Sequence, residues 1–105
     1  MEARPFVRIA EIDVDPARRE AFITAVTEEM DESVRVEPGV LALYAVAERD
    51  DPSRLRFFEI YADEAAYRAH LESSHFRTFR AITDSMVRSR TLIDTVPIRL
   101  SRKAD

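Results

Sequence analysis

The chain has 105 residues, of which 16 are basic and 20 are acidic, and it contains two histidines, one glycine and no cysteine or tryptophan. Walker and dinucleotide-binding loops need several glycines, and disulfides, thiolate nucleophiles and Cys-ligated metal centres need cysteine, so the composition excludes all of these. Interspersed acidic and basic residues argue against a nucleic-acid partner, the apolar run at residues 40–47 is too short to cross a membrane, and the N-terminus lacks the apolar stretch of a signal peptide, so a cytoplasmic location is expected.

A strand followed by a long helix is predicted at the start of the chain. Apolar and polar residues alternate over residues 6–12, as in a strand with one buried face. Asp15 can cap the helix, and Pro16 suits the first helical position, where the N–H that it lacks would have no partner. The helix is expected to run to about Val36. Its packed face comprises Phe22, Ala25, Val26, Met30 and Val34, with Ser33 among them.

A β-hairpin is predicted next. Gly39 follows Pro38, and a helix exit into a turn with positive φ is the simplest reason for the only glycine. Residues 40–48 and 55–61 read as strands, and the polar turn at residues 49–53 joins them. The two strands are therefore expected to pair antiparallel.

Two helices and a final strand are predicted for the second half. Asp63 is an N-cap candidate for a short helix, and Ser73 or Ser74 can cap a second helix over residues 75–88. Residues 91–100 read as the last strand, with Pro97 placing its end at a sheet edge.

This order of elements predicts an α+β protein of the ferredoxin-like, split βαβ type: a four-stranded antiparallel sheet with helices on one face. Alternation in the third strand places Phe57, Glu59 and Tyr61 on one sheet face and Phe58 and Ile60 on the other. Because both faces carry large apolar groups, the face without helices is expected to pair with a second copy, giving a homodimer with a ligand cavity.

The candidate catalytic residues are Glu59, Tyr61, His70 and His75. An unpaired buried carboxylate is costly, so Glu59 either pairs with an arginine or holds a tuned proton. His70 can transfer protons near neutral pH, or it can simply be a core histidine. His75 stands at a predicted helix start, where a structural contact is the alternative. Tyr61 is favoured as a hydrogen-bond donor to substrate because it shares a strand face with Glu59.

Three further residues are candidates for substrate binding: Tyr44, Phe57 and Met30. No metal is expected, because His70 and His75 are five residues apart rather than the three or four that align two ligands on one helix. Convergence of the two histidines and a glutamate in the folded chain is the alternative.

The middle of the chain resembles the antibiotic biosynthesis monooxygenase superfamily, which includes quinol monooxygenases. The resemblance is carried, in order, by residues 37–41 (EPGVL), 51–52 (DP), 58–67 (FEIYADEAAY) and 70–76 (HLESSHF). It implies a dimeric α/β barrel of ferredoxin-like protomers that can exchange the C-terminal strand. It also implies oxygenation of an aromatic or quinol substrate with O2 and without metal, flavin or haem.

The resemblance also separates branches of this superfamily. Isomerase-like members carry a histidine where this chain aligns Met30, and haem-degrading members carry an axial histidine where it aligns Arg80. We therefore expect a cofactor-independent monooxygenase in which His70, with His75, takes a substrate proton, Tyr61 binds the oxyanion and Glu59 balances charge. The alternatives are an isomerase of a small carbonyl metabolite and a non-catalytic ligand-binding dimer.

Overall fold

The structure, a computed structural model, describes residues 4–104. Residues 1–3 and 105 of the predicted single domain lie outside the described residues. The elements are β1 (Phe6–Val14), α1 (Arg19–Val36), β2 (Val40–Ala47), β3 (Arg54–Tyr61), α2 (Glu64–Glu72), α3 (Ser74–Thr83) and β4 (Val87–Asp94), with 3-10 turns at Pro16–Arg18 and Asp84–Met86.

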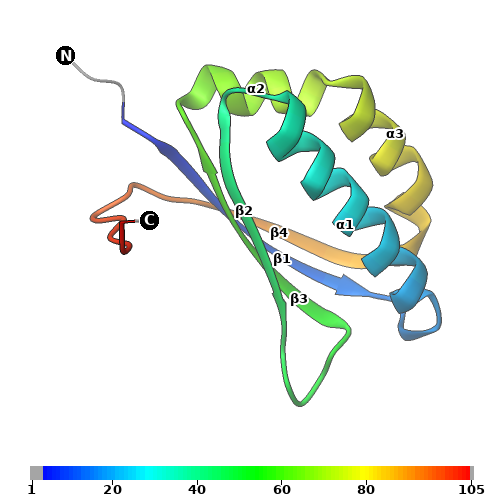
Figure 1. The fold of residues 1–105 in the computed structure, drawn as a ribbon. Helices are drawn as coiled ribbons and strands as arrows, with labels where there is room; N and C mark the ends of the chain where they lie inside the picture. The colour runs from blue at the N-terminus through cyan, green and yellow to red at the C-terminus, as the bar shows by residue number, and fades with distance from the viewer. Residues whose placement is uncertain (1–3, 105) are drawn as a thin grey trace.

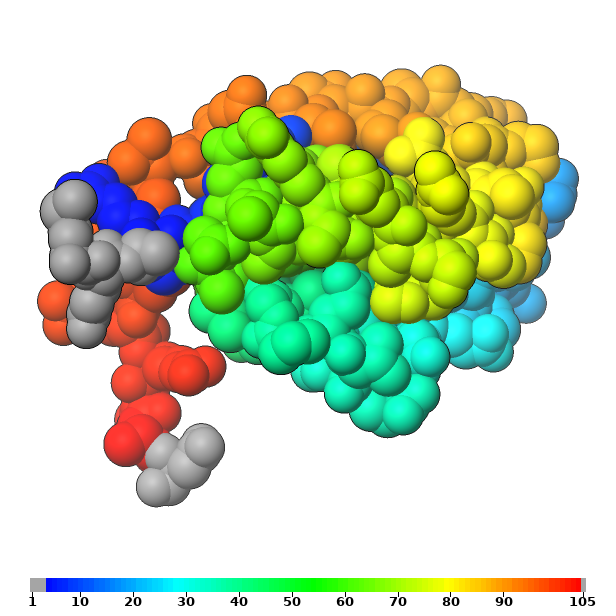
Figure 2. Space-filling model, turned by 90° about the horizontal axis from the view of Figure 1, so that it is seen from above, coloured from blue at the N-terminus to red at the C-terminus, as the bar shows by residue number. Residues whose placement is uncertain are grey.

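The four strands form one antiparallel sheet in the order β2-β3-β1-β4, and all three helices lie on one face of it (Figure 1). This is the predicted ferredoxin-like α+β fold. Seen from the helical side, the α2–α3 segment runs between α1 and β4 (Figure 2). Phe22 and Val26 of α1 and Met86 pack over Ala10 and Phe57 of the sheet, which makes the main core.

The predicted caps at Asp63 and Ser73 are confirmed, whereas Asp15 caps the 3-10 turn at Pro16–Arg18 and α1 itself begins at Arg19 without a side-chain cap. The Asp15 side chain accepts a hydrogen bond from the Ala17 N–H (3.0 Å), and Asp63 accepts one from Ala66 (2.8 Å). Ser73 caps α3 through the Phe76 N–H. These side chains satisfy amide donors that a helix start leaves free.

Gly39 does not have the positive φ that the sequence suggested, since no described glycine has one. A close approach between two segments of the chain explains the glycine at this position instead. A Cβ built on Gly39 would lie 2.5 Å from the Cβ of Ala66 on α2. Ordinary carbon–carbon contacts are about 3.5–4.0 Å, so any side chain here would push α2 away from the turn between α1 and β2.

The predicted boundary between the last helix and the last strand lies too far toward the C-terminus. α3 ends at Thr83, a 3-10 turn follows, and β4 covers Val87–Asp94 rather than residues 91–100, so Pro97 lies beyond the strand. The tight turn keeps Met86 buried while its carbonyl accepts the Asp15 N–H (2.8 Å). The helical spacing of Met86 therefore reflects a packed turn after the helix.

The sheet face opposite the helices exposes apolar side chains. Tyr44 and Val46 of β2 are 55% and 64% exposed, and Phe58 and Ile93 are 36% and 38% exposed. Strand pairing places Tyr44 beside Phe58 and Ile93 beside Ile9. The two-sided apolar character expected of the sheet is thus present. Among the helices of the described residues, none is long and apolar enough to cross a membrane.

Candidate functional site

A cavity of about 100 Å³ lies between the helices and the sheet. Its wall is mostly apolar and aromatic, with polar groups at a few points, which is typical of a small-molecule site. The apolar lining includes Phe22, Val26, Met30, Leu43, Phe57, Phe76, Phe79 and Leu92. The polar lining is Arg8, Glu29, Glu59, Tyr67, His70, Arg80 and Arg90.

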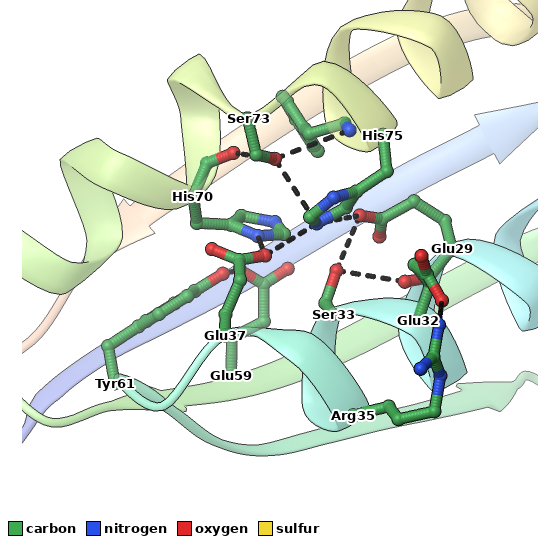
Figure 3. A network of polar contacts seen from close by, with 11 residues as sticks. Glu29, Glu32, Ser33, Arg35, Glu37, Glu59, Tyr61, His70, Ser73 and His75 are labelled. Carbon is green, nitrogen blue, oxygen red and sulfur yellow. Dashed lines mark hydrogen bonds and ion pairs between the residues drawn. The ribbon is translucent and has the colours of Figure 1, made fainter.

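His70 and Glu37 form a carboxylate–imidazole pair at the cavity wall (Figure 3). The Nδ1 of His70 lies 2.9 Å from Oε2 of Glu37, and the His70 side chain is 5% exposed. A carboxylate only accepts hydrogen bonds, so Nδ1 carries the proton and Nε2 is the unprotonated nitrogen of the neutral ring. The ring also packs against Phe76, with centroids 4.7 Å apart, which fixes its orientation.

His75 contacts the same carboxylate from the start of α3. Its Nε2 lies 2.6 Å from Oε2 of Glu37 and 3.2 Å from Oγ of Ser73. Burial opposes ionisation of Glu37, but hydrogen bonds from His70 and His75 and their charges outweigh it, so the pKa of Glu37 is lowered. His75 faces a groove between α1 and α3 rather than the cavity.

Glu59 and Tyr61 form a second polar pair on β3. The Tyr61 hydroxyl donates to Oε1 of Glu59 (2.7 Å), and Glu59 lines the cavity. Burial raises the pKa of Glu59, and the hydrogen bond from Tyr61 only partly offsets this. Burial and the neighbouring Glu59 raise the pKa of Tyr61 as well. Glu59 is thus poised to hold a proton beside the cavity.

Two site residues were not singled out from the sequence. Glu29 is buried on α1, where its Oε1 accepts a hydrogen bond from Oγ of Ser33 (2.6 Å). The signal was a carboxylate in the apolar stripe: Phe22, Val26, Glu29 and Ser33 follow steps of four, three and four. Val34, predicted to pack, is instead 49% exposed. Glu37 was noted only as part of a matching stretch.

Glu29, His70 and His75 could together hold a metal ion. Their donor atoms all lie within 4.8 Å of one another. Two imidazoles and a carboxylate suit a divalent transition metal. Nδ1 of His70 and Nε2 of His75 already contact Oε2 of Glu37, so a metal ion held by these two nitrogens would compete with those contacts.

The remaining candidate residues do not all reach the cavity. Met30 and Phe57 line the cavity, next to Glu59 and His70. Tyr61 is fully buried and is not part of the lining, so it reaches the cavity only through Glu59. Tyr44 lies on the opposite face of the sheet, where it pairs with Phe58.

The sequence profile described as "Antibiotic biosynthesis monooxygenase" matches residues 5–82, well over half of the chain. The chain belongs to this family. A search of curated proteins gives no significant match.

Several solved structures are similar to this chain. A proposed antibiotic biosynthesis monooxygenase from Bacteroides thetaiotaomicron is 42% identical, with a TM-score of 0.91 over 97% of each chain. A proposed monooxygenase from Lactobacillus acidophilus is 32% identical (TM-score 0.82), over 87% of this chain and 44% of that one. A proposed antibiotic biosynthesis monooxygenase from Nitrosomonas europaea is 26% identical (TM-score 0.84), over 90% of this chain and 99% of that one. These matches support a general monooxygenase-like role.

Proposed function

We propose that this family member is a cofactor-independent monooxygenase that oxidises a hydroxylated aromatic compound or quinol with O2. The observation that carries the proposal is the pair formed by His70 and Glu37 at 2.9 Å. Such a pair fixes the imidazole tautomer and stabilises the imidazolium that forms when His70 accepts a proton. Nε2 of His70 makes no hydrogen bond among residues 4–104, so it is free to meet a substrate hydroxyl at the cavity.

Deprotonation prepares the ring for oxygen. His70 takes the hydroxyl proton at Nε2, and the electron-rich ring anion then reduces O2 and binds it at a hydrogen-bearing carbon ortho or para to the oxygen. Loss of the hydrogen on that carbon and cleavage of the O–O bond release water and leave a quinone. The substrate supplies all the electrons: C10H8O + O2 gives C10H6O2 + H2O for a naphthol.

Glu59 is proposed as the proton donor to the departing oxygen. Its pKa is raised by burial, and it lines the same cavity as His70. Tyr61 is a positioning residue, because its hydroxyl contacts Glu59 at 2.7 Å. Met30 and Phe57 are proposed to pack against the substrate ring. His75 supports Glu37 from outside the cavity.

A homodimer is part of the proposal. The open sheet face carries Tyr44, Val46, Phe58 and Ile93, all at least 36% exposed. Apolar surface of this kind is stabilised by burial against a matching surface, and a two-fold dimer buries the same patch on both copies. The helices already cover the other face.

Oxygen uptake with a panel of quinols, naphthols and anthrones tests the proposal. Asn at position 70 keeps a polar side chain but cannot act as the base, so we expect His70→Asn to lower the rate by about 100-fold or more. His75→Asn should retain at least about a tenth of the rate, because His75 lies outside the cavity. An unchanged rate for His70→Asn would overturn the assignment. Substrate turnover without O2 would favour an isomerase.

A further inference from the structure

Three arginines gather on the side of the cavity formed by β1, α3 and β4. Arg8, Arg80 and Arg90 all line it. The proposed reaction uses none of them. Burial in an apolar cavity disfavours a charged group whose hydrogen-bond donors are only partly satisfied.

Arg8 has a buried donor without a partner. Strand pairing sets Arg8 opposite Glu59, yet its guanidinium pairs with Oδ1 of Asp94 (3.0 Å), whose side chain is 88% exposed. The Arg8 side chain is 13% exposed, and its Nε makes no hydrogen bond within residues 4–104. The guanidinium carbon lies 4.7 Å from the ring centre of Tyr67, which also lines the cavity. Arg8 is therefore held in place with a donor to spare.

Arg80 and Arg90 share a single carboxylate. Nε of Arg80 lies 2.8 Å from Oδ1 of Asp84, and Arg90 lies 3.7 Å from the same oxygen. Burial, together with the charge of Arg80, lowers the pKa of Arg90. The side chain of Asp84 is 55% exposed, so the shared carboxylate lies largely in solvent.

The aspartates that pair with these arginines lie largely in solvent. The three guanidiniums share only two of them, Asp84 and Asp94, and the carboxyl groups of Glu29 and Glu59 also line the cavity. The proton-handling groups, His70, Glu59 and Glu29, come from α2, β3 and α1. Figure 2 shows the α2–α3 segment, which carries His70 and Arg80, between α1 and β4, the strand that carries Arg90.

We propose that Arg8, Arg80 and Arg90 form a carboxylate subsite, and that the substrate is a hydroxylated aromatic carboxylic acid. This inference rests on the proposed function for the hydroxyl end of the molecule. The carboxylate accepts hydrogen bonds from Nε of Arg8 and from the guanidiniums at the β4 edge, while the hydroxyl lies at Nε2 of His70. Guanidinium groups bind carboxylates through paired, charge-assisted hydrogen bonds.

Calorimetric titration with a matched pair of probes tests this subsite under anaerobic conditions. The probes are 6-hydroxy-2-naphthoate and 6-hydroxy-2-naphthamide, which share a ring system and differ in charge. We expect the acid to bind about 10- to 100-fold more tightly, with a preference that shrinks as salt is raised. Equal affinities, or no binding of either probe, would overturn the proposal.

Variants test whether Arg8 causes the preference for the acid over the amide. Arg8→Gln should reduce the preference for the acid to less than about 3-fold, whereas Arg8→Lys, which keeps the charge, should retain part of it. Arg77→Gln is the matched control, because Arg77 is exposed on α3 and is not among the cavity-lining residues. Thermal melts of each variant check that it is folded. A full preference in a folded Arg8→Gln protein would contradict the assignment.

The binding test separates this inference from the proposed function. His70→Asn should keep the preference for the acid, since His70 acts on the hydroxyl. If oxygen uptake fails while the preference depends on Arg8, the proposed function is refuted and the subsite stands. If oxygen uptake depends on His70 but the acid and amide bind equally, the subsite is refuted and the function stands.

Discussion

Gly39 allows the turn between α1 and β2 to contact α2, the helix that carries His70, close to the pair formed by Glu37 and His70. Glu37 precedes Gly39 by two residues, and His70 follows Ala66 by four on α2. In Gly39→Ala the new Cβ would lie 2.5 Å from the Cβ of Ala66. Restoring ordinary contact requires a shift of about 1 Å. The same shift would lengthen the 2.9 Å contact between Glu37 and His70.

The energetic cost follows from overpacking. Forcing an extra methyl into a packed contact costs about 1–3 kcal/mol. Ala66→Gly removes the opposing methyl but costs about 0.5–1 kcal/mol, because glycine is a poor helix residue. We therefore expect the double variant to be about as stable as Ala66→Gly alone. The coupling between the two sites should be at least about 1 kcal/mol in favour of the pair.

Urea unfolding followed by circular dichroism measures these free energies, with all proteins at one concentration in case of association. Ala65→Gly is the matched control, because Ala65 is an exposed neighbour on the same helix and should not rescue Gly39→Ala. A Gly39→Ala protein as stable as the parent would refute the steric reasoning, and so would equal rescue by both helix glycines.

Three further outcomes are expected. Glu37→Gln should lower the oxygenation rate about 10- to 100-fold, because a neutral amide stabilises the His70 imidazolium less than a charged acceptor; a rate within twofold of the parent would count against the pair. The pKa of Glu59 is raised in the folded state, so Glu59 contributes less to the stability of the fold as the pH rises above 4.5, the usual pKa of a glutamate. Glu59→Gln should therefore raise the free energy of unfolding more at pH 7 than at pH 4, and an equal change at both would argue against a perturbed carboxyl. Phe58→Asp should give a monomer by light scattering, with Ile82→Asp on the helical side as control; a dimeric Phe58→Asp protein would exclude the open sheet face.

Local chemistry predicts most of the fold. Asp63 and Ser73 have side chains that cap helices, and both do so here, while Asp15 caps the 3-10 turn that precedes α1. The end of α3 escaped prediction because Met86 keeps helical spacing while it lies in a 3-10 turn. The role of Gly39 was also hidden, since its partner Ala66 is distant in sequence and close only after folding.

Only part of the site could be predicted from the sequence, for the same reason. His70, Glu59 and Tyr61 stand out because polar residues on packed faces are unusual. Glu37 stands at the end of α1, 33 residues from His70, and nothing local distinguishes it from a solvent-exposed glutamate. Arg8 likewise alternates with apolar residues on β1, and only the fold shows that its Nε is buried. Contacts between distant segments define this site.

The central claim is that the chain itself transfers one oxygen atom from O2 to an aromatic ring without a cofactor. Mass spectrometry of the product formed under 18O2, with protein dialysed against chelator, tests it most directly. We predict one 18O atom in each quinone formed by the parent protein and loss of product formation in His70→Asn. Unlabelled product, or product formed only after a metal ion is added back, would contradict the claim.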